Sequence, residues 1–352
     1  MTDKSKPDAL WYTRCSIPTP LGLGAQLGWY QEEFAADGIT IKSLQESNDP
    51  AEQASHFEHS LPHSFRLGGS VPAIWTKAKG RETRVIGISW IDEYQAIIAL
   101  PESGIRGPAD LRGRKLGLPA SSARKDSVDV ARATALRGLL LGLELAGLEH
   151  KDAEWVDVAS RRDAEQNVQA PDTSVRRRRA HSYTDTALAL ARGEVDAIYV
   201  KDVRGAETAH LLGARVVADL GFHPDPHFHI NNSTPRPLTV NQDTLTRYPE
   251  LVRRFLARVR GVDGLARQNP AEAVREIALE TNWTESWVRF AYGEKVHQSL
   301  GVDLSERAIA GLSEYKDFLL QWGFIDKDFS VRDWIDPAPL ESLAQNVQSQ
   351  AA

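Results

Sequence analysis

The chain has 352 residues, of which 41% are hydrophobic and 26% are charged. This length favours two lobes or domains over one small core, and the composition is that of an ordinary globular protein. The formal net charge of −6 gives no reason to expect nucleic acid or an anionic membrane as a partner.

The single cysteine, Cys15, rules out an internal disulfide and cysteine zinc clusters. Residues 1–8 are polar and lack the apolar stretch of a secretory signal. No run approaches the roughly 18 apolar residues of a membrane span. We therefore expect a cytoplasmic protein without a membrane or nucleic-acid partner, and we take a monomer as the working expectation.

Short apolar strands and helical patterns alternate along the first part of the chain. Strands are expected at residues 9–12, 38–41, 85–88, 96–100, 155–158, 197–200 and 214–217. The runs at 85–88 and 96–100 are continuously apolar, which is typical of strands buried on both faces of a parallel or mixed sheet. A helix is expected over roughly residues 24–36, with Gly38 at its end, and a Leu-rich core helix over residues 128–148.

From Leu238 onward the pattern is mostly helical. The expected helices are residues 249–268, 270–280 and 306–322. Two loops look like crossings between lobes: residues 100–118, and residues 221–237, which are rich in proline and polar residues. The alternation of strands and helices predicts an α/β protein with two lobes, in which mixed sheets are flanked by helices.

The crossings define the predicted lobes. One lobe combines residues 1–100 with residues 238–352, and the other comprises residues 101–237, including the crossings. A ligand would bind in the cleft between the lobes, the usual position for a site at a domain interface.

The residues best suited to chemistry lie in the first seventy positions: Cys15, then His56, Arg66 and the pair Gly68 and Gly69. A flat guanidinium is the best side chain for bidentate recognition of two oxygens on one centre. Glycines let backbone N–H groups approach the same anion, and cationic surroundings favour a thiolate. The set predicts that a small oxyanion is bound and attacked.

This set resembles the aryl sulfinate desulfinase family of the dibenzothiophene desulfurisation pathway. That family lies within the type II periplasmic binding proteins, close to the sulfonate, nitrate and taurine branch. The likeness is carried by Tyr12, Cys15, Pro18, His56, Phe57, Pro62, Arg66, Gly68 and Gly69, and by residues 102–122, 193–199, 208–220 and 321–334. The resemblance implies a two-lobed fold with the active site in the cleft between the lobes.

The resemblance also implies roles for single residues. Cys15, His56 and Arg66 would be catalytic, and Gly69 would provide a backbone donor. Substrate binding is expected from Gly69, Gly68, Phe57, Arg14, Ser121 and Ser122. The two serines are chosen because they precede the Leu-rich helix, where anion sites often form.

The sequence departs from the family pattern at three positions. Arg14 stands where the family has a small polar residue, Leu61 replaces a glutamine, and Thr134 falls near an aromatic residue of the biaryl pocket. Losing an aromatic wall weakens stacking on a second ring, and an added guanidinium favours a further acidic group. We therefore expect a sulfinate that is smaller or more anionic than the biaryl compound.

The reaction implied by the resemblance is hydrolytic carbon–sulfur cleavage, which releases sulfite, without a metal or an organic cofactor. The Cys15 thiolate would attack sulfur to give a thiosulfonate-like intermediate, or the thiol would protonate the ring carbon; His56 tunes the thiol in either route. The alternative is an ABC-transporter-type solute-binding protein for a sulfonate, nitrate or related small anion. A third class is another reaction on the same fold, such as decarboxylation of an aromatic acid or pyrimidine assembly.

Other polar clusters receive structural interpretations. His59 and His63 are interpreted as pocket-rim or surface residues, because Pro62 interrupts a helix that could hold a metal. The histidines within residues 223–229 lie among prolines and are interpreted as part of a hinge loop. The arginine run at residues 176–179 is short and is interpreted as a solvated loop.

Overall fold

A computed structural model of the chain describes residues 6–13, 15, 17–121, 128–159 and 183–351. The chain divides into two compact units, the first comprising residues 1–91, 232–289 and 294–352, and the second residues 92–231 and 290–293. Both boundaries lie somewhat before the positions expected from the sequence, 100 and 237. Within the described residues, no helix is both long enough and apolar enough to cross a membrane.

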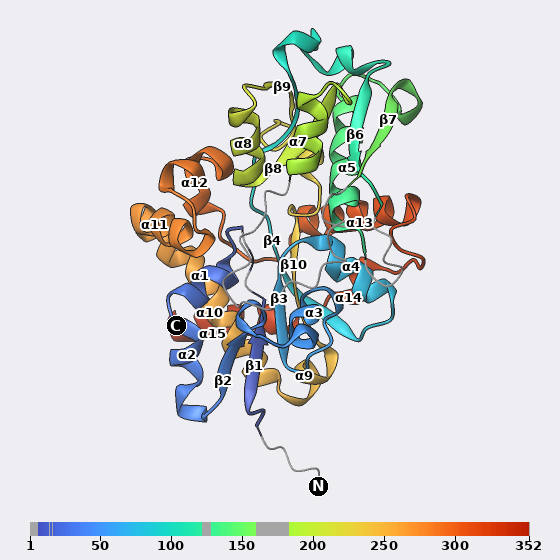
Figure 1. Cartoon of the computed structure of the whole chain (residues 1–352). Helices are drawn as coiled ribbons and strands as arrows, with labels where there is room; N and C mark the ends of the chain where they lie inside the picture. The colour runs from blue at the N-terminus through green and yellow to red at the C-terminus, as the bar shows by residue number, and fades with distance from the viewer. Residues whose placement is uncertain (1–5, 14, 16, 122–127, 160–182, 352) are drawn as a thin grey trace. The chain divides into compact units, whose positions relative to one another are not determined.

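The first unit is built on a five-stranded sheet of order β2-β1-β3-β10-β4 (Figure 1). Its strands are β1 (Ala9–Tyr12), β2 (Thr40–Ser43), β3 (Ser64–Leu67), β4 (Thr83–Ser89) and β10 (Arg236–Asn241). Strand β1 pairs in parallel with β2 and β3, whereas β10 runs antiparallel between β3 and β4. A strand from late in the sequence therefore completes a sheet that the first ninety residues begin.

The first unit also contains α-helices, of which the one at residues 285–292 ends in the second unit. They are α1 (Pro20–Gln26), α2 (Trp29–Phe34), α3 (Pro50–Glu58), α4 (Ser70–Ala78), α9 (Gln242–Arg247), α10 (Pro249–Gln268), α11 (Pro270–Thr281), α12 (Glu285–Tyr292), α13 (Glu306–Gln321), α14 (Val331–Trp334) and α15 (Ala338–Ala351). On one face, Phe255 of α10 stacks on Phe65 and Tyr30, with ring centroids 3.8 and 4.4 Å apart. Leu10, Tyr12, Phe65 and Leu67 belong to this buried core.

The second unit repeats the same topology with a sheet of order β7-β6-β8-β5-β9. Its strands are β5 (Gln95–Ala99), β6 (Lys115–Pro119), β7 (Glu154–Val158), β8 (Ala197–Lys201) and β9 (Arg215–Asp219). Strands β6, β7 and β8 are parallel, and β5 runs antiparallel to β8 and β9. In each sheet, therefore, the fourth strand in spatial order is the antiparallel one.

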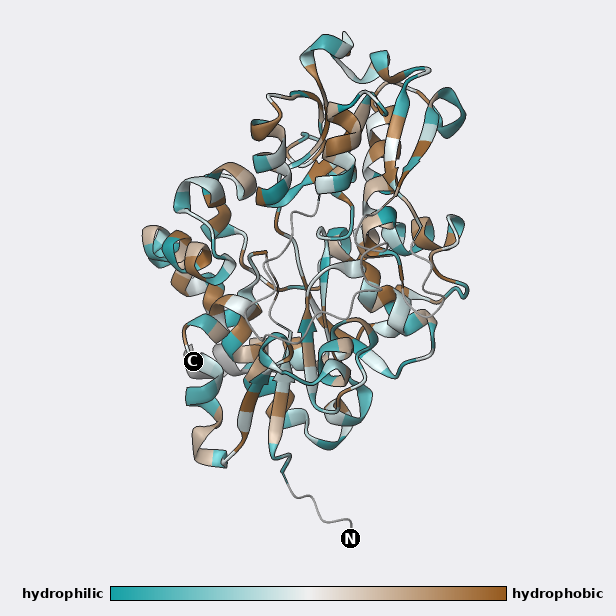
Figure 2. Ribbon diagram, viewed as in Figure 1, coloured by the Kyte–Doolittle hydropathy of each residue, from teal (hydrophilic) through white to brown (hydrophobic). Residues whose placement is uncertain are grey.

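The described helices of the second unit are α5 (Val130–Glu144), α7 (Thr184–Ala191) and α8 (Asp202–Leu211). Helix α5 packs closely on its sheet through two glycines: a methyl group on Gly138 would lie 2.1 Å from the Tyr199 ring, and one on Gly142 would lie 2.0 Å from Ile97. Helices of both units show alternating bands of brown and teal in Figure 2, as expected of amphipathic helices with one face on a core.

The two-sheet α/β architecture predicted from the sequence is confirmed. Strand β1 and helix α10 have the expected bounds, and the other expected strands are found with ends shifted by a few residues. The expected helix at residues 24–36 is wrong, because the chain forms α1 and α2, separated at Gly28, whose φ is 75°. Positive φ interrupts an α-helix, and glycine adopts it without steric cost.

Three strands of the structure were not expected from the sequence: β3, β6 and β10. Each contains a charged residue or a proline, which obscures the apolar run that marks a buried strand. Strand β6 lies partly inside the stretch that was expected to be a crossing, and β10 lies where mostly helical structure was expected.

Candidate active site

Arg66 is a fully enclosed cation on β3, with an exposed fraction of 2%. Its Nε donates to the carbonyl oxygen of His56 and its Nη2 donates to that of Gly69, both at 3.0 Å. The third nitrogen, Nη1, is buried and has no hydrogen-bond partner within the described part of the chain. Two neutral carbonyls therefore fix the guanidinium in place, and no carboxylate within the described residues pairs with it.

Electrostatics favour an anion beside this guanidinium. Burial lowers the pKa of Arg66 to about 10, and the Cys15 side chain acts in the opposite direction. Arg66 therefore remains cationic at neutral pH. A buried charge without a partner is costly, and an anion that accepts from Nη1 would offset that cost. The arrangement would therefore suit a bound anion.

The Cys15 thiol and the Arg66 guanidinium both lie close to Gly68. A methyl group on Gly68 would lie 3.6 Å from Arg66 Nη2 and 3.9 Å from Cys15 Sγ. The thiol is free and partly exposed. The structure thus brings Cys15, Arg66 and Gly68 together across about fifty residues of sequence, and the absent side chain of Gly68 leaves room between the thiol and the guanidinium.

His56 lies in the last turn of α3 and holds Arg66 through its backbone carbonyl. Burial, and next the charge of Arg66, lower the pKa of His56 to about 3, so the ring is neutral at physiological pH. Its Nδ1 lies 3.3 Å from Gln45 Nε2. Because the Gln45 amide nitrogen can only donate, Nδ1 is the acceptor and Nε2 carries the proton. His56 is therefore a hydrogen-bond donor at Nε2 and a weak base.

Gly69 connects β3 to α4 and must be small for a different reason than Gly68. Asn232 caps α4: its carbonyl oxygen accepts from Ser70 N at 2.5 Å and its Oδ1 accepts from Val71 N at 2.9 Å. A methyl group on Gly69 would lie 2.6 Å from Asn232 Oδ1. The predicted role of the Gly69 N–H as a donor to substrate stays a prediction, whereas its carbonyl has a direct role in holding Arg66.

The two glycines give a matched pair of variants. Gly68→Ala should fold normally, because the added methyl meets its neighbours at ordinary van der Waals distance, but it should reduce activity by filling the space beside the thiol. Gly69→Ala should lower the free energy of unfolding by about 1–3 kcal/mol, because the methyl overlaps Asn232. Thermal melts and turnover assays of both variants test this, and a fully active Gly68→Ala protein would contradict the placement of the site.

The expectation that His59 lies on the surface or at a pocket rim is wrong, because His59 is buried, with an exposed fraction of 3%. Its Nε2 donates to Ser64 O at 3.2 Å, and its Nδ1 lies 3.4 Å from Thr239 Oγ1. Helix α3 ends at Glu58, and His59 follows it in a left-handed backbone conformation, with a φ of 48°. His63 is half-buried, and its Nδ1 lies 3.0 Å from Thr244 Oγ1.

The buried state of His59 predicts acid sensitivity. Burial, and next Arg66, lower its pKa from the ordinary 6.5 to about 3. Between these values the unfolded chain binds more protons than the folded one, so this contribution to stability is complete above pH 6.5 and is lost as the pH falls towards 3. Urea unfolding between pH 7.5 and 4.5 should show this loss, at up to about 1.4 kcal/mol per pH unit for each such histidine. A His59→Gln variant should show a shallower dependence; an equal slope would contradict this assignment.

The remaining candidate residues differ in how the structure places them. Phe57 is 45% exposed and meets the His56 ring edge-on, with centroids 4.6 Å apart. Leu61 is half-buried, and its backbone N donates to Ser55 Oγ at 3.0 Å. Arg14, Ser122 and the arginine run at 176–179 lie outside the described residues.

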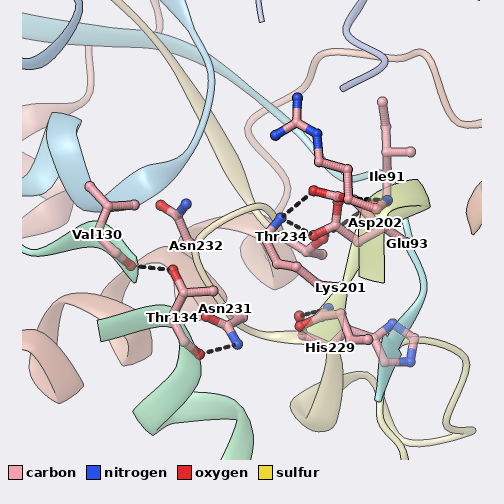
Figure 3. A network of polar contacts seen from close by, with 12 residues as sticks. Ile91, Glu93, Val130, Thr134, Lys201, Asp202, His229, Asn231, Asn232 and Thr234 are labelled. Atoms are coloured by element: carbon pink, nitrogen blue, oxygen red, sulfur yellow. Dashed lines mark hydrogen bonds and ion pairs between the residues drawn. The ribbon is translucent and has the colours of Figure 1, made fainter. Parts of the chain in front are cut away.

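Two candidate positions belong to the second unit. Ser121 follows β6 and is exposed. Thr134 is buried in α5; its hydroxyl donates to Val130 O at 2.6 Å and its carbonyl accepts from Asn231 Nδ2 at 3.1 Å (Figure 3). The Thr134 hydroxyl is therefore engaged within its own helix.

Lys201, at the end of β8, is a cation that already has partners. Its Nζ lies 2.9 Å from Glu93 Oε1 and 3.8 Å from Asp202 Oδ2 (Figure 3). Burial, with repulsion from Glu93, raises the pKa of Asp202. The positive charge of Lys201 is thus neutralised within the second unit, in contrast to that of Arg66.

The histidines of residues 223–229 have protein partners rather than a common centre. His229 Nδ1 lies 2.8 Å from Asp92 and its Nε2 lies 2.6 Å from the carbonyl oxygen of His223, whereas His227 Nε2 lies 3.1 Å from Glu144. A search of the described residues finds no group of three or more His, Cys, Asp or Glu side chains suited to a metal ion.

Sequence reasoning missed several residues of this site. Gln45 sets the tautomer of His56, Asn232 holds the start of α4, and Thr239 donates to Arg66 O at 3.4 Å. The polar run at residues 231–234 is visible in the sequence, but nothing local in the sequence links it to Gly69, more than 160 residues away.

No family model matches the sequence. The chain is similar to two curated proteins named 2'-hydroxybiphenyl-2-sulfinate desulfinase, from Rhodococcus erythropolis and Rhodococcus qingshengii. Each is 26% identical over an alignment that covers 95% of this chain and 93% of the relative.

Solved structures agree with this likeness. A cysteine-to-serine variant of the desulfurisation enzyme DszB in complex with biphenyl-2-sulfinic acid superposes with a TM-score of 0.74 at 24% identity, covering 96% of this chain and 99% of that chain. The periplasmic aliphatic sulphonate binding protein SsuA from Escherichia coli gives a TM-score of 0.64 at 17% identity, covering 94% and 98%. The chain is similar to the 2'-hydroxybiphenyl-2-sulfinate desulfinases over most of its length and has the periplasmic-binding-protein fold.

Proposed function

We propose that the protein is an aryl sulfinate desulfinase, a hydrolase that converts an aryl sulfinate and water into the arene and hydrogen sulfite. The observation that carries this proposal is the buried, uncompensated guanidinium of Arg66 next to the chain's single thiol. An anion-binding protein needs the guanidinium alone. The partly exposed thiol at the same point adds a nucleophile or an acid, and the likeness to proteins named desulfinases supports a reaction at a sulfinate.

The geometry supports a division of labour between the two groups. Arg66, fixed by the carbonyls of His56 and Gly69, would donate to the sulfinate through Nη1, which has no other acceptor among the described residues. The sulfinate sulfur would then occupy the room left by Gly68, within reach of Cys15 Sγ. Preorganised donors stabilise developing charge without rearrangement during the reaction, which is the principal source of catalysis in such sites.

In the nucleophilic route the Cys15 thiolate attacks the sulfinate sulfur, the carbon–sulfur bond breaks, and the ring carbon takes a proton. The resulting cysteine S–SO₂⁻ group is then cleaved by water, which regenerates the thiol and releases hydrogen sulfite. In the alternative route the Cys15 thiol protonates the ring carbon, the carbon–sulfur bond breaks and SO₂ leaves. Water then adds to SO₂ to give hydrogen sulfite, and the proton released returns to the Cys15 thiolate. The neutral His56, with its proton on Nε2, would donate a hydrogen bond in either route rather than remove the thiol proton.

The aromatic part of the substrate has a candidate contact in Phe57. This ring is 45% exposed although it is large and apolar, and it adjoins His56, which adjoins Arg66. An exposed aromatic side chain beside an anion site suits a ligand with an acidic head and an aromatic body. A sulfinate smaller than the biaryl compound, which is one of the substrates expected from the sequence, needs no larger aromatic surface.

A binding protein for sulfonates or a related anion is the second candidate. It is favoured by the fold shared with SsuA and by the same Arg66 receptor, which would hold an anion whether or not chemistry follows. A panel of benzenesulfinate, a carboxylated arylsulfinate, hydroxybiphenyl sulfinate and methanesulfonate separates the two, with sulfite release and binding measured in parallel. A desulfinase releases sulfite from at least one sulfinate, whereas tight binding without sulfite supports the binding protein.

A further inference from the structure

Thr13 lies directly beside Arg66 in the sheet of the first unit. Strand β1 pairs in parallel with β3, with Trp11 opposite Ser64 and Tyr12 opposite Phe65. The ladder continues past the end of the strand, because Thr13 N donates to Phe65 O at 3.0 Å, as Trp11 N does to His63 O. This register sets Thr13 opposite Arg66.

Thr13 and Arg66 also share a face of the sheet. Side chains alternate along each strand, and Tyr12 and Phe65 point into the core beside α10. The next residue on each strand, Thr13 or Arg66, therefore points to the opposite face. Cys15 Sγ also lies near this face, because a methyl group on Gly68, two residues after Arg66, would be 3.9 Å from it. Thr13 thus lies on the same face of the sheet as the thiol and the guanidinium.

Both side chains have an unpaired polar atom in an enclosed place. Thr13 is 0% exposed, and within the described residues its Oγ1 has no hydrogen-bond partner, as is also true of Arg66 Nη1. Native proteins pair nearly all buried polar atoms, so each such atom calls for an explanation. Two unpaired donors on adjacent positions of one face have a simple common explanation, which is a bound group with two acceptor oxygens.

We propose that Thr13 is a substrate-binding residue whose hydroxyl donates to one oxygen of the anion while Arg66 Nη1 donates to the other. This inference rests on the proposed function for the identity of the anion, an aryl sulfinate. A β-branched side chain has restricted χ1 freedom, so the hydroxyl is held in place before the ligand arrives. With both oxygens held, the sulfinate has one orientation at the thiol, and Thr13 selects for anions with two acceptor oxygens.

The test compares Thr13→Val, which keeps the shape and removes the donor, with Thr13→Ser, which keeps the donor. Binding of benzenesulfinate is measured calorimetrically in a Cys15→Ala background, so that no turnover occurs, and each variant is also melted. Thr13→Val should raise the Kd about 10- to 100-fold, as expected for a lost hydrogen bond to a charged group, without lowering Tm. Thr13→Ser should stay within about threefold of the parent.

Ser43 provides a matched control. Its hydroxyl is also buried and has no hydrogen-bond partner in the described part of the chain, but Ser43 pairs with Tyr12 in the sheet and therefore lies on the α10 face. Ser43→Ala should leave the Kd unchanged. If Thr13→Val binds benzenesulfinate as tightly as the parent, whether or not its Tm is lower, the inference is wrong although the proposed function stands. If the parent protein binds no benzenesulfinate and the wild type releases no sulfite, the inference and the proposed function both fail.

Discussion

Replacing Cys15 with serine is expected to abolish sulfite release while the protein remains folded and still binds the sulfinate. A serine hydroxyl is far less ionised and far less nucleophilic than a thiol, and it is also a poorer acid, so both routes lose their reacting group. The anion receptor, in contrast, is Arg66, whose hydrogen bonds to His56 and Gly69 do not involve Cys15. Turnover with saturating sulfinate and calorimetric binding to the same variant separate the two effects.

The chain offers a clean chemical control, because Cys15 is its single cysteine. Iodoacetamide should add one carbamidomethyl group, detected by mass spectrometry, and activity should fall in proportion to that adduct. Benzenesulfinate should slow both processes by occupying the space at Gly68. Sulfite release by the serine variant at the wild-type rate would remove Cys15 from the mechanism.

Arg66→Lys is the second change with a large expected effect. Lysine keeps one positive charge but cannot donate to two carbonyls and still direct a further nitrogen at the substrate. Loss of a buried, charge-assisted contact should weaken substrate binding by about 2–3 kcal/mol, and the rate should fall as well. Binding constants and turnover of this variant measure both losses.

Arg254 supplies a matched control for this change. It forms ion pairs with Glu33 and Asp37, both at 2.7 Å, and its charge is therefore compensated. Arg254→Lys should leave substrate affinity unaltered. An Arg66→Lys protein with wild-type affinity and rate would show that the buried guanidinium has only a structural role.

Much of the fold could be predicted from the sequence because its strands are short apolar runs. The strands that contain Ile86, Ile97 and Ile198 are recognisable from composition, since they are buried on both faces. Strand β10 cannot be recognised from composition, because it begins with Arg236 and Pro237. Only its pairing with β3 and β4 identifies it as a strand. Pairing between segments so far apart in sequence is a tertiary property that no local pattern records.

Part of the candidate site could be predicted from residue types alone. The residues whose roles depend on tertiary contacts could not. Cys15, Arg66 and Gly68 are chemically distinctive, and their residue types point to an anion and a nucleophile. Thr13 and Gln45 are common residue types, and their roles depend on register and on burial. His59 lies in the turn after α3 with a φ of 48°, and neither this turn nor the burial of His59 is evident from the sequence.

The most direct test of the account is the yield of products from benzenesulfinate incubated with the wild-type protein. Sulfite and benzene are quantified in the same samples over time, with the Cys15→Ser protein in parallel. The account predicts equal molar amounts of sulfite and benzene, many per protein molecule, and neither product above the uncatalysed level with the serine variant. Tight binding of benzenesulfinate without formation of either product would contradict it.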